Sequence, residues 1–243
     1  MTQLAQREIA QTAGTTWQQD AYRDLAERLS PPSAFPCTFS QNAFRRELIQ
    51  FSFVETLDDC GLRMATEDLL DYVKDCEKWD GRVNTAKPFL MVFSENLARF
   101  DTVEQYHDFG WRMLQHWHDV DPRAWPSTVA TKPEEPFWSF CFGGMQLFVN
   151  MSAPAHRRRK SRNLGRHFTM VINPRERFDI VAGDSIEGQK IRAKIRQRVA
   201  DYDDAPHSPL LGSYQKGELE WVQYALPEEN SAAVGRCPLR FRG

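Results

Sequence analysis

The sequence lacks the paired cysteines that a disulfide framework or a structural zinc site needs. Its five cysteines, Cys37, Cys60, Cys76, Cys141 and Cys237, are an odd number and form no Cys-x-x-Cys pair. We therefore expect reduced thiols. The sequence also has no apolar run that approaches the roughly 20 residues needed to cross a bilayer, which excludes a membrane-spanning protein.

Two further absences narrow the class of protein. Residues 1–16 are polar and lack the basic start, apolar middle and cleavage site of a secretory signal, so we expect a soluble, cytoplasmic protein. The formal net charge is −2, without the basic excess over the whole domain that a nucleic-acid binder shows. We therefore expect neither a nucleic acid nor a membrane as a partner.

The order of helical and strand patterns predicts a single α+β domain. A chain of 243 residues can bury a sizeable core, and no long flexible linker divides it. Helices and strands are interspersed, and a plain β-turn-β unit lies in the middle of the chain. This pattern favours a mixed or antiparallel central sheet with packed helices. We treat residues 1–32 as an N-terminal helical segment and residues 33–243 as one compact unit.

The spacing of apolar residues and the positions of capping residues and prolines predict the helices and strands. Helices are predicted twice within residues 3–29, over 67–79 with Thr66 as the cap, from Thr102 to before Pro122, and over 186–202. Strands are predicted over 47–57, 89–93, 167–172 and 220–226.

Two local motifs make sharper predictions. Residues 137–142 and 145–150 flank Gly143-Gly144, which supplies the positive φ angles of a tight β-hairpin turn. Asn173 can cap a short helix with Pro174 at its first position.

A histidine beside a dense cationic patch is the most informative feature of the chain. His156 precedes four basic residues at 157–160 and then Arg162, in the loop expected between the hairpin and the strand at 167. Haem b fits both halves of this pattern, because its iron takes an axial imidazole and its propionates pair with arginines. We therefore predict His156 as the iron ligand, with Arg157, Arg158 and Arg162 as propionate partners.

Other residues stay open as cofactor ligands. His167 begins a predicted strand near the basic loop and is a second candidate ligand or a propionate-binding group. Cys37 is the alternative axial ligand, because a thiolate donates electron density to haem iron. Its apolar neighbours also suit a cysteine that only packs. Arg175 can hold a propionate or a substrate carboxylate.

Several motifs resemble one known family. They are Phe35-Pro36-Cys37, Phe140-Cys141-Phe142-Gly143-Gly144, the segment 152–162, Asn163-Leu164-Gly165, the segment 173–179, Leu211-Gly212-Ser213-Tyr214 and Glu220-Trp221. With these pieces the chain resembles the YqcI/YcgG family from about residue 33 onward. The resemblance implies a haem-dependent N-oxygenase like those of guanitoxin and D-cycloserine assembly, which hydroxylate a guanidine or amine nitrogen.

The resemblance also implies substrates and partners. The substrate is a small arginine-like guanidine or amine, for whose binding Asp179, Glu176 and Glu220 are the candidate carboxylates. Dioxygen is the co-substrate, and the electrons come from a separate reductase, because the sequence has no dinucleotide fingerprint and no iron–sulfur cysteine cluster. The alternative is a non-catalytic haem- or anion-binding protein. The oligomeric state is open, with a homodimer as one alternative.

Overall fold

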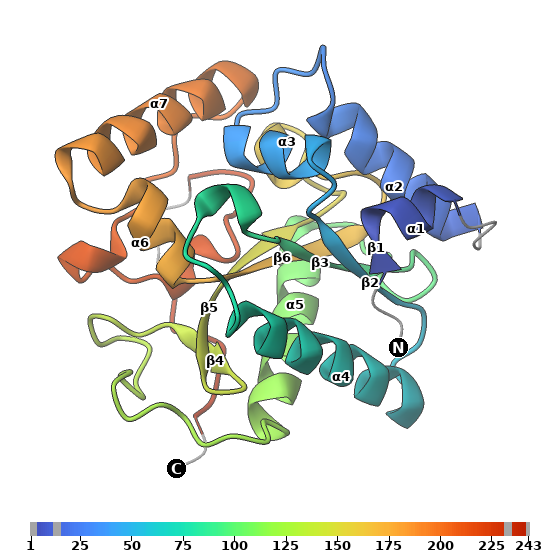
Figure 1. Ribbon diagram of the computed structural model, residues 1–243, viewed down its shortest axis with the longest axis horizontal. Coiled ribbons are helices and arrows are strands. Elements are labelled where there is room, and N and C mark those ends of the chain that lie inside the picture. Colours follow the sequence, from blue (N-terminus) through green and yellow to red (C-terminus); the bar gives the residue numbers. More distant parts are fainter. Residues whose placement is uncertain (1–3, 12–15, 231–234, 242–243) are drawn as a thin grey trace.

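The computed structural model describes residues 4–11, 16–230 and 235–241, which form a six-stranded sheet with helices on both faces (Figure 1). The helices are α1 (Gln6–Gln11), α2 (Thr16–Leu29), α3 (Thr38–Arg45), α4 (Asp59–Cys76), α5 (Val103–Asp119), α6 (Glu176–Ala182) and α7 (Ile186–Tyr202). The strands are β1 (Leu4–Ala5), β2 (Gln50–Val54), β3 (Phe89–Phe93), β4 (Phe140–Phe142), β5 (Met145–Ser152) and β6 (Phe168–Pro174). Short 3-10 turns cover Val83–Thr85, Lys160–Arg162, Tyr214–Lys216 and Trp221–Gln223.

The sheet is mixed, as the sequence predicts. Its strand order is β1-β2-β3-β6-β5-β4, and β2 pairs with β3 in parallel while the other neighbours are antiparallel. The parallel pair needs a crossover connection, which α4 provides. The expectation of an α+β domain is confirmed. No helix in the described ranges is long and apolar enough to span a membrane.

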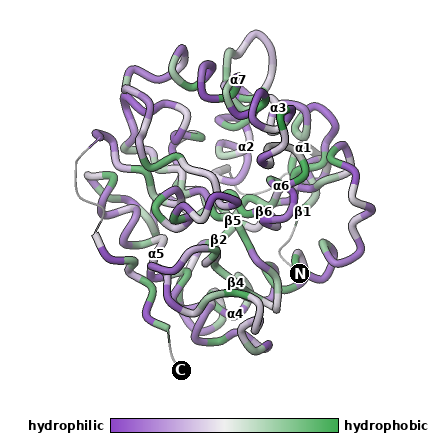
Figure 2. The backbone as a smooth tube through the Cα atoms, turned by 90° about the vertical axis from the view of Figure 1, so that its left-hand side faces the viewer, coloured by the Kyte–Doolittle hydropathy of each residue, from purple (hydrophilic) through white to green (hydrophobic). Residues whose placement is uncertain are grey.

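Strand β3 explains why both faces of the sheet are covered. Phe89, Met91 and Phe93 lie in the hydrophobic core shared with α4 and α5. Leu90 and Val92 point the other way and join the core shared with α1, α2 and α3. Alternate residues of a strand face opposite sides, so an apolar strand must be buried on both. In Figure 2 the apolar strands lie between α4 below and α3 and α7 above.

Several predicted elements are confirmed where local signals are strong. Thr102 caps α5 in a reciprocal capping box with Gln105, and α7 covers the predicted residues 186–202. The hairpin of β4 and β5 turns at Gly143 and Gly144, whose φ angles are +60° and +77°. A side chain at either position would be strained, which is why the pair of glycines marks this turn.

Two boundary predictions are wrong for physical reasons. Helix α4 begins at Asp59, with the Asp58 carboxylate accepting the Gly61 N–H at 2.8 Å, so Thr66 lies inside the helix. Asn173 and Pro174 do not cap a helix, because both remain in β6 and pair with β5. The following helix starts at Glu176, directly after the strand ends.

The predicted strand over 220–226 is also wrong. Residues 221–223 form a 3-10 turn instead. The Tyr224 hydroxyl accepts the Phe140 N–H at 3.1 Å, and its oxygen lies 3.0 Å from the Leu147 carbonyl oxygen. Trp221 and Tyr224 thus supply apolar bulk to the core under β4 and β5. Tertiary packing outweighs the β propensity of this segment.

Candidate functional site

A pocket of about 440 Å³ lies on the face of the sheet that α3 and α7 cover. Its floor is formed by Phe148, Asn150 and Ser152 of β5 and by Val171 and Asn173 of β6. These residues alternate along their strands, so their side chains share one face of the sheet. The pocket is therefore bounded by the sheet on one side and by residues of α3 and α7 on the other.

One wall of the pocket carries a thiol. Cys37 is the N-cap of α3, and its Sγ accepts the backbone N–H of Ser40 at 3.4 Å. Phe35, Leu29 and Ile49 give the same wall an apolar surface. Cys37 is a free, partly buried cysteine. A cysteine that lines a pocket can bind a metal through its sulfur.

A second wall is cationic. Arg159 and Arg162 line the pocket from the loop between β5 and β6. Arg162 donates to the backbone carbonyls of Gln223 and Tyr224 at 3.0 and 3.4 Å. The Arg159 guanidinium likewise donates to a carbonyl and to an asparagine side chain. Burial lowers the pKa of Arg162 to about 9. Guanidinium groups hydrogen-bonded only to neutral acceptors are well suited to receive an anion.

A third part of the pocket is acidic. Arg175 lies between Asp179, with which it forms an ion pair, and Glu220, whose Oε2 is 3.4 Å from Nη1. The guanidinium carbon also lies 3.5 Å from the centre of the Tyr214 ring. All four residues line the pocket. Two carboxylates and an aromatic face are the surroundings that a planar guanidinium prefers.

The Glu220 carboxylate is held from the side opposite Arg175. Its Oε1 accepts the hydroxyls of Ser139 and Tyr224, each at 2.7 Å. Burial raises the pKa of Glu220, although these hydrogen bonds and the charge of Arg175 act in the opposite direction. The carboxylate therefore keeps a fixed orientation toward the pocket.

His156 does not line this pocket. Its Nδ1 lies 2.7 Å from Glu228 Oε2, and its Nε2 is buried without a hydrogen-bond partner in the described ranges of the chain. The ring faces that of His107 on α5, with ring centres 5.8 Å apart, on the side of the sheet opposite the pocket. No group of three or more histidine, cysteine or acidic side chains that could hold a metal ion occurs in the described part of the chain.

The remaining predicted residues separate into two sets. Arg162, Arg175, Asp179 and Glu220 meet at the pocket. Arg157 and Arg158 are exposed, and Arg158 forms an ion pair with Glu229, while Glu176 is exposed as well. Arg159 was not among the predicted partners, although it is the buried member of its run. Sequence alone does not reveal which of several consecutive arginines turns inward.

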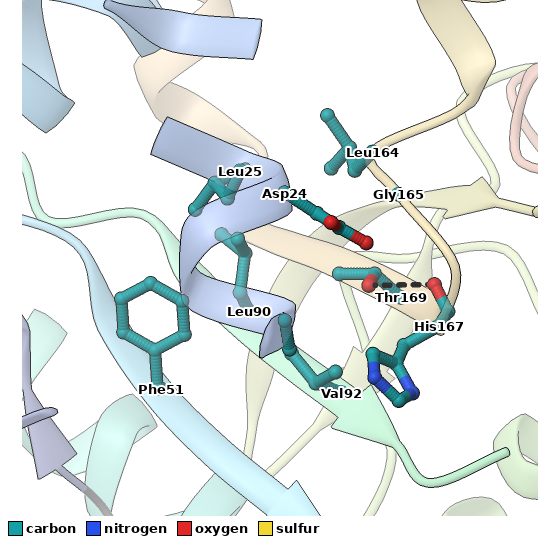
Figure 3. Close-up of a pocket in the computed structure, with 10 residues that line it drawn as sticks. Asp24, Leu25, Phe51, Leu90, Val92, Leu164, Gly165, His167 and Thr169 are labelled. Carbon is teal, nitrogen blue, oxygen red and sulfur yellow. Dashed lines mark hydrogen bonds between the residues drawn. The ribbon is translucent and has the colours of Figure 1, made fainter. Parts of the chain in front are cut away.

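His167 lies in a separate small cavity (Figure 3). The cavity has a volume of about 10 Å³, which is too small for a cofactor. Both ring nitrogens of His167 are buried and have no hydrogen-bond partner among the residues that the structure describes, and the ring lies 5.4 Å from that of Trp17. Asp24 of α2 closes the cavity and pairs with Arg166 at 2.9 Å. This histidine packs between the sheet and α2, in a cavity that shares Leu25, Leu90 and Leu164 with the larger pocket, whose lining does not include His167.

His107 should make the folded protein sensitive to acid. Burial, together with the charges of His156 and Arg162, lowers the pKa of His107 from 6.5 to about 3. Between pH 6.5 and pH 3 the unfolded chain therefore binds a proton at His107 that the folded chain does not bind. The free energy of unfolding falls as the pH drops through this range. The decrease in the free energy of unfolding is up to ~4 kcal/mol. Urea unfolding at several pH values should show a shallower decline for His107→Gln; an unchanged slope would contradict the assignment.

Comparisons with known proteins agree on one family. The model of the YqcI/YcgG family matches residues 25–240. A Streptomyces lavendulae protein named "Putative N(omega)-hydroxy-L-arginine synthase DcsA" is 52% identical over 227 residues, covering 93% of this chain and 85% of that protein. The protein YcgG of Bacillus subtilis (strain 168) is 30% identical over 229 residues, covering 93% and 88%. No solved structure matches.

Proposed function

This chain belongs to the YqcI/YcgG family, and on that premise we propose that it hydroxylates a guanidine nitrogen of an arginine-class substrate, using haem b and dioxygen. The relative from Streptomyces lavendulae, named for the synthesis of N(omega)-hydroxy-L-arginine, supports the substrate class. The observation that carries the proposal is the pocket itself. It combines a thiol, two carboxylates and three buried arginines, Arg159, Arg162 and Arg177, that donate to neutral groups.

The residues of the pocket fit a haem group. The apolar wall around Cys37 suits a flat macrocycle, and the Arg159 and Arg162 guanidiniums suit its propionates. Among the three ligands proposed from sequence, Cys37 lines the pocket, whereas His156 and His167 do not. We therefore propose that the Cys37 sulfur would hold the haem iron. The Ser40 N–H, which the Cys37 sulfur accepts, would hold this side chain in position.

The bound haem would supply the activation of dioxygen. The overall reaction takes a nitrogen–hydrogen bond, dioxygen, two electrons and two protons, and gives a nitrogen–hydroxyl bond and water. The electrons come from a separate donor. The role of the protein is to hold the nitrogen in place and to exclude bulk water through the apolar side chains of α3 and α7.

The charges of the pocket orient the substrate. Asp179 and Glu220 attract its guanidinium, and Ser139 and Tyr224 fix the direction of the Glu220 carboxylate. An amine such as lysine would gain the charge but lose the stacking on Tyr214 and the paired hydrogen bonds. We therefore expect a preference for guanidines over amines.

The proposed activity can be tested with purified protein. Protein supplied with haem, a chemical reductant and ¹⁸O₂ should convert L-arginine into a product heavier by one labelled oxygen atom, detected by mass spectrometry. L-Lysine should react more slowly, and omission of haem should abolish the product. Stoichiometric haem binding without turnover of any guanidine or amine would favour a non-catalytic haem-binding protein. Absence of haem binding would instead favour an anion-binding protein, a function that Arg159 and Arg162 at the pocket also support.

A further inference from the structure

Arg175 occupies a slot that is built for a guanidinium. Its side chain is 4% exposed, and its guanidinium lies between the carboxylates of Asp179 and Glu220 and over the ring of Tyr214. The backbone around Arg175 does not depend on this arrangement. Arg175 precedes α6 at the N-cap position, where its side chain makes no capping hydrogen bond.

Two of the three groups that surround the Arg175 guanidinium, Tyr214 and Glu220, are held in place by other residues. The Tyr214 hydroxyl donates to the Phe137 carbonyl at 2.7 Å and accepts from Gln146 Nε2 at 3.0 Å, which fixes its ring. Glu220 is fixed separately by two hydroxyls, as described above. A slot held in shape by other residues would bind any planar guanidinium that enters it.

We propose that Arg175 is an internal competitor that occupies the guanidinium subsite until the substrate displaces it. The inference rests on the proposed function for its substrate class. A guanidinium substrate exchanges one set of ion pairs for a chemically equivalent set, so the exchange needs little net energy. The displaced Arg175 remains at the pocket and becomes available to the substrate carboxylate. Amines cannot complete this exchange, because they lack the planar fork.

The first test uses guanidinium chloride as the probe, without haem or turnover. Removal of the competitor in Arg175→Ala should increase guanidinium affinity on the order of 10- to 100-fold, measured by calorimetry and by the rise in melting temperature. Arg175→Lys keeps a cation near both carboxylates but loses the planar fork, so its affinity for the probe should lie between those of the wild type and Arg175→Ala. The double variant Arg175→Ala/Asp179→Asn should lose the gain.

The second test uses the wild-type protein, so it stands even if Arg175→Ala does not fold. The guanidinium of Arg175 lies 3.5 Å from the centre of the Tyr214 ring, so its side-chain NMR signals should be shifted by the ring current. The signals are assigned by comparison with Arg175→Lys. Addition of guanidinium should move them toward the positions of a solvent-exposed arginine, whereas methylammonium at the same concentration should not.

Two results would overturn the inference. One is equal guanidinium affinity in Arg175→Ala and wild type, and the other is an Arg175 signal that stays in place at saturating guanidinium. Neither result bears on haem binding or on arginine hydroxylation. Conversely, a protein in which guanidinium displaces Arg175 but which does not hydroxylate arginine would support the subsite and contradict the proposed reaction.

Discussion

Cys37→Ser should abolish N-hydroxylation while leaving the fold intact. Serine is a favoured N-cap residue and can accept the Ser40 N–H that the Cys37 sulfur accepts now, so α3 should be at least as stable. The alcohol cannot replace a thiolate as an electron-rich ligand of haem iron. We expect arginine turnover to fall by roughly 10²-fold or more. The visible spectrum of the haem-loaded variant should lose the features of thiolate ligation.

Matched variants separate this effect from the general loss of a cysteine. Cys60 is exposed on α4 and away from the pocket, so Cys60→Ser should keep wild-type spectrum and activity. His156→Gln should also keep the spectrum, because His156 faces α5 and not the pocket. The opposite pattern, in which His156→Gln changes the spectrum and Cys37→Ser does not, would make the imidazole the ligand.

Arg162→Met should weaken haem binding far more than Arg157→Met. Both variants replace an arginine of the same basic loop by a side chain of similar length. Arg162 is buried at the pocket, whereas Arg157 is exposed. Loss of a charge-assisted hydrogen bond to a propionate should reduce affinity on the order of 10- to 100-fold for Arg162, and less than about twofold for Arg157. Haem titration followed by absorbance measures both.

Stability provides the control for this comparison. Arg162 donates only to two backbone carbonyls, so its loss should change the free energy of unfolding by no more than about 2 kcal/mol, measured in urea. Equal haem affinity in the two variants would contradict the placement of the anionic groups beside Arg162.

The sequence predicts those parts of the fold that local chemistry determines. The glycines at 143–144 permit one kind of turn, and Thr102 with Gln105 forms a cap within four residues. Helix α7 has a clear start, at which Ser185 caps it, and its full length is predicted. The strand prediction for residues 220–226 is wrong, because their aromatic side chains have β propensity but pack in the core below the hairpin.

The candidate site is less predictable, because it is assembled from distant segments. The basic loop is evident in the sequence, but Arg157 turns to solvent while Arg159 is buried, which depends on contacts with residues near 227–230. Cys37 and Glu220 meet at one pocket although 183 positions separate them in the numbering. Their apolar or aromatic neighbours resemble ordinary core, so for Cys37 the sequence alone favours packing over ligation.

X-ray absorption at the iron edge of haem-loaded wild-type protein tests the central claim most directly. The account predicts one sulfur atom in the iron coordination shell and its loss in Cys37→Ser, since Cys37 is the thiol on the apolar wall of the pocket. A coordination shell of nitrogen and oxygen atoms alone in the wild-type protein would contradict it.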